Sequence, residues 1–175
     1  MRKLFFLFGV ATIMIFSGCG DSDERPESYF TVNGERLFLG EGFIYDWGTN
    51  NQITTRNYDI ELCDSESAYA NYIEFTISSN STTRLQEGTY SYKQISEKGF
   101  FTSPKIGMNI KYDGNDVAIS GTRLKEFDMA NISGDIVVTQ EEGDYKFVID
   151  MKFEVDGKPY VIYGEYWGAL KSYTY

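Results

Sequence analysis

The fold is decided by the stretch YKFVIDMKFEV, Tyr145 to Val155, in which apolar and polar side chains alternate. One set of alternate residues is entirely apolar: Tyr145, Phe147, Ile149, Met151, Phe153 and Val155. The opposite set is charged except at Val148. Because successive side chains of a β-strand point to opposite faces, a period of two predicts an antiparallel strand with one buried face.

The same alternation recurs in shorter runs at 58–62, 72–77 and 105–112. Between strand-like runs lie the dipeptides Asn33-Gly34, Asp113-Gly114 and Asp156-Gly157. These dipeptides favour tight hairpin turns whose two central residues both have positive φ. The sequence therefore predicts an all-β domain over 28–175, a single antiparallel meander of about eight to ten strands. A calycin- or lipocalin-like barrel is expected, with a β-sandwich as the alternative.

Few segments depart from the strand pattern. A short helix of at most a turn or two is indicated over 124–130, where Leu124 and Phe127 stand three apart. The polar segments 48–57 and 64–71 are typical of loops.

The N-terminus has the pattern of a secretory signal peptide over residues 1–18. Basic residues at the start precede thirteen uncharged residues, Leu4 to Phe16, and then Ser17-Gly18-Cys19. The apolar run is shorter than the roughly 20 residues that span a bilayer. The arrangement resembles the lipobox of bacterial lipoproteins, although Phe16 stands where Leu, Val or Ile is usual. That resemblance implies that Cys19 becomes the acylated first residue of the mature protein.

Residues 19–27 are expected to form a flexible acidic tether behind the lipid anchor. A tether of this length reaches less than roughly 30 Å, so the domain stays close to its membrane. The acidic cluster after Cys19 resembles the sorting signal of surface lipoproteins in Bacteroidetes. This implies an outer-membrane lipoprotein at the cell surface, with a periplasm-facing position as the alternative.

The charge balance argues against nucleic acid as a partner. The chain carries 16 basic and 26 acidic residues, and removal of residues 1–18 leaves a net charge of −12. A polyanion is repelled by such a surface.

The residue types also limit the chemistry. The chain has no histidine, which excludes Ser-His-Asp and Cys-His nucleophiles and histidine metal sites. Once Cys19 is acylated, Cys63 has no partner for a disulfide or a thiolate cluster, and we expect no cofactor. Cys63 shares the parity of Asp59 and Glu61, whose charges would raise its pKa, and we interpret it as a spectator at a strand end.

Two carboxylates stand among aromatic residues. Asp46 lies between Tyr45 and Trp47, and Glu165 shares a strand face with Tyr163 and Trp167. A carboxyl group among aromatic rings can have a raised pKa and act as a general acid. Asp46 and Glu165 are therefore the candidates for a glycan-cleaving pair, although exposed charges at a sheet margin give the same pattern.

Aromatic residues make up 17% of the chain, and the strand 160–167 is apolar on both faces. One interpretation is a central strand that is covered on both sides. The other is an exposed surface in which Tyr45, Trp47, Tyr163 and Trp167 stack against sugar rings or line the mouth of a barrel.

Several strand and turn motifs carry a family resemblance. They are Leu85-Gln86-Glu87-Gly88-Thr89-Tyr90, the segments 132–138 and 143–147, and Gly164-Glu165-Tyr166-Trp167-Gly168. They resemble a pattern in small uncharacterised lipoproteins of Bacteroidetes. The resemblance implies an antiparallel β-domain on a lipid anchor and implies no catalytic residue.

The sequence as a whole predicts a non-catalytic cell-envelope lipoprotein that binds a ligand, such as a glycan, or an envelope partner protein. Its membrane partner is reached through Cys19. The alternatives are a glycan-cleaving hydrolase and a lipocalin-like carrier of a small apolar ligand, which requires a roomy barrel interior.

Replacement of Cys19 with Ala should release the protein from membranes, because the acyl chains supply the anchor. Ultracentrifugation of cell lysates measures this, with Cys63→Ala as the control that stays in the membrane pellet. Persistence of the Cys19→Ala protein in the membrane fraction would contradict lipid anchoring.

Overall fold

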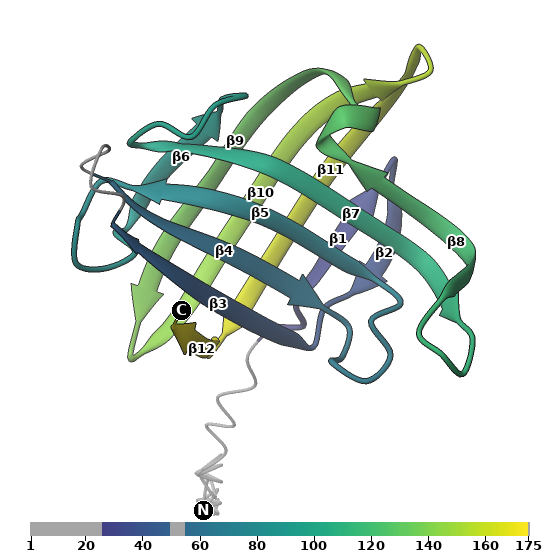
Figure 1. Ribbon diagram of the computed structural model, residues 1–175, viewed down its shortest axis with the longest axis horizontal. Coiled ribbons are helices and arrows are strands. Elements are labelled where there is room, and N and C mark those ends of the chain that lie inside the picture. The colour runs from purple at the N-terminus through teal and green to yellow at the C-terminus, as the bar shows by residue number, and fades with distance from the viewer. Residues whose placement is uncertain (1–25, 50–54, 175) are drawn as a thin grey trace, which may run out of the picture.

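The computed structural model describes residues 26–49 and 55–174, which form one strongly curled sheet (Figure 1). The expected signal peptide, Cys19 and most of the tether lie outside the described residues. In chain order the strands are β1 (Tyr29–Val32), β2 (Glu35–Phe38), β3 (Glu41–Thr49), β4 (Arg56–Cys63), β5 (Tyr72–Ser79), β6 (Gly88–Tyr92), β7 (Phe100–Tyr112), β8 (Ala118–Lys125), β9 (Ala130–Glu141), β10 (Asp144–Val155), β11 (Lys158–Gly168) and β12 (Lys171–Thr174). A short 3₁₀ helix, η1 (Glu126–Asp128), confirms the helical turn expected near residue 126.

The sheet curls into a half-barrel, which confirms the all-β fold class. Its strand order is β12-β3-β4-β5-β7-β6-β9-β10-β11-β1-β2, and β8 pairs with β7 beside this path. We call β3, β4, β5, β7 and β8 the front half, because they face the viewer in Figure 1. The rear half consists of β9, β10, β11, β1 and β2, and β6 connects the two halves at one side.

Two details of the expected meander are wrong. The sheet has 12 strands in place of about eight to ten, and two of its pairings are parallel, β12 with β3 and β6 with β7. β11 lies between β10 and β1, and after it ends at Gly168 the chain pairs with β3, at the opposite end of the strand order. Alternation identifies a strand and its buried face but carries no information about the partner strand.

The hairpin turns agree with the sequence at two of three positions. Asn33-Gly34 and Asp156-Gly157 both have positive φ at the two central residues, as a tight turn requires. Asp113-Gly114 does not form such a turn. There Asp113 Oδ1 accepts hydrogen bonds from the N–H groups of Asn115 and Val117, at 2.8 and 2.9 Å, and the residue with positive φ is Asp116. The aspartate side chain stabilises a longer turn.

The loop expectations hold in part. Residues 64–71 form a loop, as expected. In the segment 48–57, β3 extends to Thr49 and β4 begins at Arg56, and residues 50–54 lie outside the described part.

The apolar faces of the two halves meet in the interior. Phe75 of β5 packs edge-on against Phe147 of β10, with ring centroids 5.9 Å apart, and Phe147 also contacts Tyr166 of β11. The alternation in 145–155 is confirmed, because Phe147 and Ile149 are fully buried while Asp150 and Lys152 are exposed. Direct contact between the halves thus joins apolar side chains of both into one buried core.

Truncation of Phe147 to Ala should lower the free energy of unfolding by about 3–5 kcal/mol, because it removes a ring that is buried between the halves. Urea denaturation measures the loss. The exposed Lys152 on the same strand is the control, and Lys152→Ala should change stability by less than about 0.5 kcal/mol. Equal losses in the two variants would contradict the assignment of the core.

Candidate functional site

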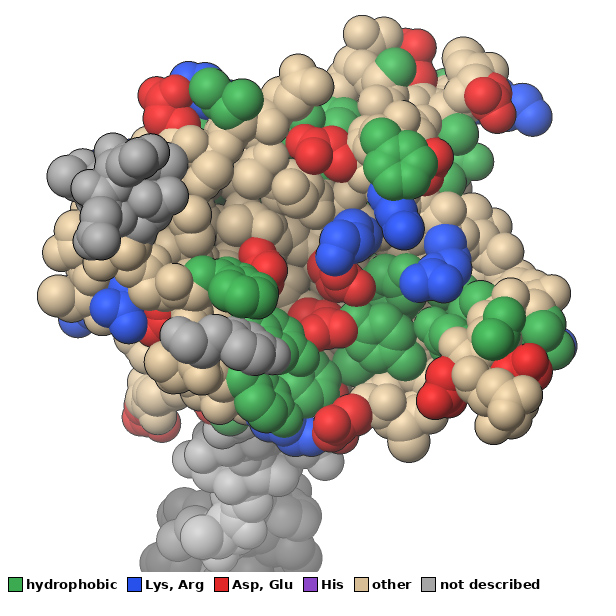
Figure 2. All heavy atoms as spheres, in the orientation of Figure 1, with side chains coloured by type: hydrophobic (Ala, Val, Ile, Leu, Met, Phe, Trp, Pro, Cys, Tyr) green, Lys and Arg blue, Asp and Glu red, His purple; other side chains and the backbone are tan. Residues whose placement is uncertain are grey.

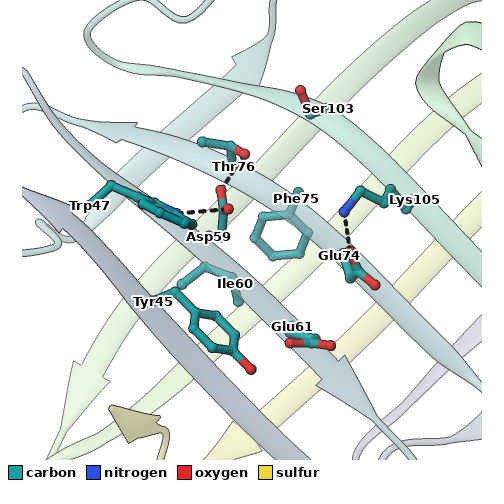
Figure 3. A pocket seen from close by; sticks show the side chains of 10 residues that line it. All are labelled: Tyr45, Trp47, Asp59, Ile60, Glu61, Glu74, Phe75, Thr76, Ser103 and Lys105. Atoms are coloured by element: carbon teal, nitrogen blue, oxygen red, sulfur yellow. Dashed lines mark hydrogen bonds and ion pairs between the residues drawn. The ribbon is translucent and has the colours of Figure 1, made fainter. Parts of the chain in front are cut away.

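An open hollow of about 440 Å³ lies on the outer face of the front half, on the side of the sheet away from the core. Figure 2 shows acidic, basic and aromatic side chains gathered around it, and Figure 3 shows its lining. We call it the outer hollow. Its lining comprises Tyr45, Trp47, Asp59, Ile60, Glu61, Glu74, Phe75, Thr76, Ser103 and Lys105.

The strand period explains why polar side chains face outward here. Ile60 and Phe75 belong to the buried core, so their chain neighbours point to the opposite face. The register then aligns the outward residues in two rows across the strands. One row holds Tyr45, Asp59 and Thr76, and the other holds Glu61, Glu74 and Lys105.

The aromatic end of the outer hollow is held by hydrogen bonds. The Trp47 side chain is 54% exposed, and its indole Nε1 donates to Asp59 Oδ2 at 2.8 Å (Figure 3). Thr76 Oγ1 donates to the other oxygen of Asp59 at 2.5 Å. Tyr45 stacks on Tyr173 of β12, with ring centroids 5.2 Å apart. The two aromatic rings therefore lie in defined positions on an open surface.

The centre of the outer hollow contains two opposed glutamates. Glu61 and Glu74 are direct partners in the β4–β5 register. The Tyr69 hydroxyl contacts an oxygen of Glu61 and lies 2.8 Å from Glu74 Oε1. Lys105 Nζ donates to the second oxygen of Glu74 at 2.5 Å. Burial, and then the negative charge of Glu74, raise the pKa of Tyr69, so its phenol stays neutral.

A second apolar cluster lies on the same face of the sheet, beside the outer hollow, and contains Phe43, Cys63, Tyr72 and Ile110. Cys63 is fully buried, and burial raises the pKa of its thiol to about 12, with Asp64 and other acidic neighbours contributing less. The expected rise in the pKa of Cys63 is therefore confirmed. Its main cause is burial, whereas the sequence analysis attributed it to acidic neighbours.

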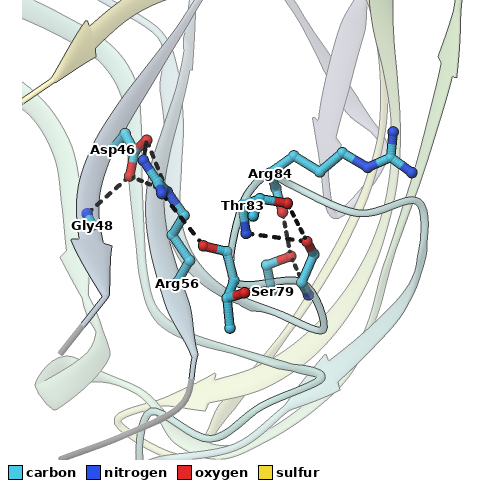
Figure 4. A network of polar contacts seen from close by, with 8 residues as sticks. Asp46, Gly48, Arg56, Ser79, Thr83 and Arg84 are labelled. Carbon is cyan, nitrogen blue, oxygen red and sulfur yellow. Dashed lines mark hydrogen bonds and ion pairs between the residues drawn. The ribbon is translucent and has the colours of Figure 1, made fainter. Parts of the chain in front are cut away.

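Asp46 does not join Tyr45 and Trp47. It is the register partner of the buried Tyr58 and so points to the opposite face of β3. The Arg56 guanidinium binds both of its carboxylate oxygens, at 2.9 and 3.0 Å from Nε, and Gly48 N–H donates to Oδ1 (Figure 4). Hydrogen bonds from Arg56 lower the pKa of Asp46. The raised pKa that a general acid among aromatic rings would have is therefore not found at this residue.

Glu165, Tyr163 and Trp167 lie on the outer face of the rear half, on β11. Tyr163 Oη donates to Glu165 Oε1 at 2.5 Å, and Lys146 lies over the Trp167 ring. Tyr163 is 38% exposed and Val161 is 44% exposed, so the interpretation of 160–167 as a strand covered on both sides is wrong.

The structure does not bring the expected site residues together. The pair Tyr45 and Trp47 belongs to the front half, and Tyr163 and Trp167 belong to the rear half. Asp46 and Glu165 are likewise on different halves, so they do not face each other across one cleft.

Three residues of the outer hollow, Glu61, Glu74 and Lys105, were not expected to act together, nor was the neighbouring Tyr69 that contacts both glutamates. The sequence offers one signal for this group. Asp59 and Glu61 stand at alternate positions of one strand, and Glu74 stands among apolar residues of the next. On a single strand this pattern is typical of a solvated face, and only the β4–β5 register shows that the carboxylates are opposed.

The described residues contain no group of three histidine, cysteine or acidic side chains that could hold a metal ion. Within the same ranges, the helical content includes no segment with the length and apolar character needed to cross a membrane. Comparison of the chain with protein-family models, curated proteins and solved structures finds no match.

Replacement of Asp46 with Asn should destabilise the protein at neutral pH and have little effect in acid. The folded-state pKa of Asp46 is lowered, so its stabilising contribution is present above the usual value of 3.8 and is lost as the pH falls through the folded-state pKa. Chemical denaturation at pH 7 and at progressively lower pH measures the difference from wild type.

The exposed Asp150 provides the control, and Asp150→Asn should change stability by less than about 0.5 kcal/mol at pH 7. A destabilisation by Asp46→Asn that is independent of pH would show that the ionised carboxylate is not what stabilises this strand end.

Proposed function

We propose that the protein is a non-catalytic lipoprotein of the outer membrane, exposed at the cell surface, that binds a glycan in the outer hollow. The observation that carries the proposal is the exposed Trp47 beside Tyr45 and a row of carboxylates. Sugar rings have apolar C–H faces that pack on aromatic rings and hydroxyl groups that donate hydrogen bonds to carboxylates. A shallow surface with both kinds of group suits such a ligand.

The hydrogen bonds within the outer hollow support binding because they hold the groups in place before a ligand arrives. Trp47 is oriented by Asp59, and Asp59 is oriented by Thr76. Side chains that are already ordered lose less conformational entropy on binding. Free lone pairs of the carboxylates remain to accept hydrogen bonds from sugar hydroxyls.

The position of the tether supports access to the outer hollow from outside the membrane. The expected tether joins the domain at Ser28, whose Oγ accepts a hydrogen bond from Trp167 N–H in the rear half at 2.8 Å. The outer hollow is on the front half, on the other side of the filled interior. Ser28 lies where the end of β11 meets the start of β3 and is not among the residues that line the outer hollow, so attachment there leaves the hollow open to ligands.

A glycan-cleaving hydrolase is the alternative, because Glu61 and Glu74 form a carboxylate pair in the outer hollow. Glycosidases place their two carboxyl groups about 5–10 Å apart, on either side of the scissile bond. Here both glutamates contact the Tyr69 hydroxyl, and Glu74 is also bound to Lys105. Both carboxylates are thus already engaged by side chains of the protein, which favours binding over cleavage.

Replacement of Trp47 with Ala should weaken glycan binding at least about tenfold, because the stacking surface is lost. The mature chain with Cys19→Ala is screened against neutral and acidic oligosaccharides by thermal shift, and hits are measured by isothermal titration calorimetry. A ligand at 100 times its dissociation constant adds about 2.7 kcal/mol to stability, which such a screen detects.

Trp167→Phe, in the rear half, is the matched control and should bind like the parent protein. Binding that survives Trp47→Ala, or a failure of every oligosaccharide to bind, would overturn the proposal. Release of shortened sugars that stops in Glu61→Gln would establish the hydrolase in its place.

A further inference from the structure

A row of charges crosses four neighbouring strands on the outer face of the front half. In register, Glu61 of β4 is opposite Glu74 of β5, Glu74 is opposite Lys105 of β7, and Lys105 is opposite Lys125 of β8. Only the central contact pairs opposite charges. Like charges directly opposite each other destabilise a sheet, so the two outer contacts oppose folding. Such a row is the kind of local conflict that proteins retain at binding sites.

The basic end of the row is extended by Arg123. It is the register partner of Gly107, which follows Lys105 by two residues on β7. Arg123 is adjacent to the buried Leu124, so it points outward together with Lys125. Figure 2 shows basic side chains gathered on this face, directly beside acidic ones. The chain as a whole has 26 acidic and 16 basic residues and is therefore negatively charged. This cluster has the opposite sign.

Much of this positive charge is not neutralised within the described residues. Lys105 is bound to Glu74. Arg123 Nε donates to the neutral hydroxyl of Tyr72 at 3.3 Å, and Lys125 Nζ lies 5.8 Å from the ring centroid of Phe127. In the ranges that the structure describes, neither Arg123 nor Lys125 has a carboxylate within ion-pair distance. Both side chains are exposed and have donors to offer to an anion.

The basic cluster is continuous with the outer hollow. Tyr69, which contacts Glu61 and Glu74, stacks on Tyr72 with ring centroids 4.6 Å apart. The Tyr72 ring lies across Gly107, where a Cβ atom would be 2.2 Å from the ring. The absence of a side chain at Gly107 thus lets the buried Tyr72 ring pack between Tyr69 and Arg123 and connect the two ends of the row from below.

We propose that the glycan bound in the outer hollow is anionic. A carboxylate or sulfate group on the sugar lies against Arg123 and Lys125, while a sugar ring packs on Tyr45 and Trp47. The guanidinium fork binds two oxygens of such a group at once, which fixes its orientation as well as its charge. This inference rests on the proposed glycan-binding function and adds the ligand class.

The acidic end of the row is compatible with such a ligand. Glu74 is neutralised by Lys105, and Glu61 accepts a hydrogen bond from the Tyr69 hydroxyl. An anionic group would therefore be attracted to the β8 end, and the hydroxyl-rich part of the sugar would meet the carboxylates. The row sets the direction in which the glycan lies across the strands.

The test compares three probes of equal length, a galacturonic-acid oligosaccharide, a heparin-derived oligosaccharide and a neutral glucan oligosaccharide. Isothermal titration calorimetry with the mature Cys19→Ala protein should show that one of the acidic probes binds at least about tenfold more tightly than the neutral one. The double variant Arg123→Gln/Lys125→Gln should lose this preference. Added salt should weaken binding of the acidic probe and leave the neutral probe unaffected.

The matched control is Lys146→Gln/Lys152→Gln, which removes the same charge from β10 in the rear half and should retain the preference. Equal loss in both double variants would show unspecific charge attraction and overturn the inference. Equal affinity for neutral and acidic probes, with binding that depends on Trp47, would also overturn the inference of an anionic ligand. The proposed glycan-binding function would then still stand. If no probe binds, the proposed function fails as well.

Discussion

The contact between the two halves of the sheet is the constraint on which the rest of the structure depends. Phe75 and Phe147 meet in the middle, and the apolar residues around them close the curled sheet on a filled interior. Burial of these residues supplies the main stabilising free energy of the domain. Because the side chains of the inner face are buried in the core, we expect a ligand to bind to the outer face. The function proposed for the outer hollow follows from this division of the two faces.

The outer face of the front half is ordered by polar contacts between neighbouring strands. Asp59 is held by Trp47 and Thr76, and the Tyr69 hydroxyl bridges Glu61 and Glu74. The second apolar cluster lies beside these contacts on the same face, and Tyr45 and Tyr69 pack against it. Carboxylates in such a network are positioned before a ligand arrives, as recognition of hydroxyl groups requires. The rear half also carries exposed aromatic residues and an opposed pair of carboxylates, Asp135 and Asp150, but these do not line the outer hollow.

Alternation in the sequence was sufficient to predict the class of fold and several local features. The buried face of 145–155 follows from the strand period of two. The tight turns at Asn33-Gly34 and Asp156-Gly157 follow from the positive φ angles that these residue types adopt readily. The turn at Asp113 differs because a side chain accepts hydrogen bonds from the backbone ahead of it. Such local competition between side chain and backbone is not visible in a dipeptide pattern.

The sequence by itself determined that this chain forms β-strands with one apolar face, because that property depends on residues next to each other along the chain. Only the tertiary structure decided which strands are neighbours. It separated Trp47 from Trp167, turned Asp46 toward Arg56, and placed Glu61 opposite Glu74. These outcomes depend on register and on the curl of the sheet, which arise from packing between segments far apart in the sequence. The chemistry of the site therefore became visible only once the strands were paired.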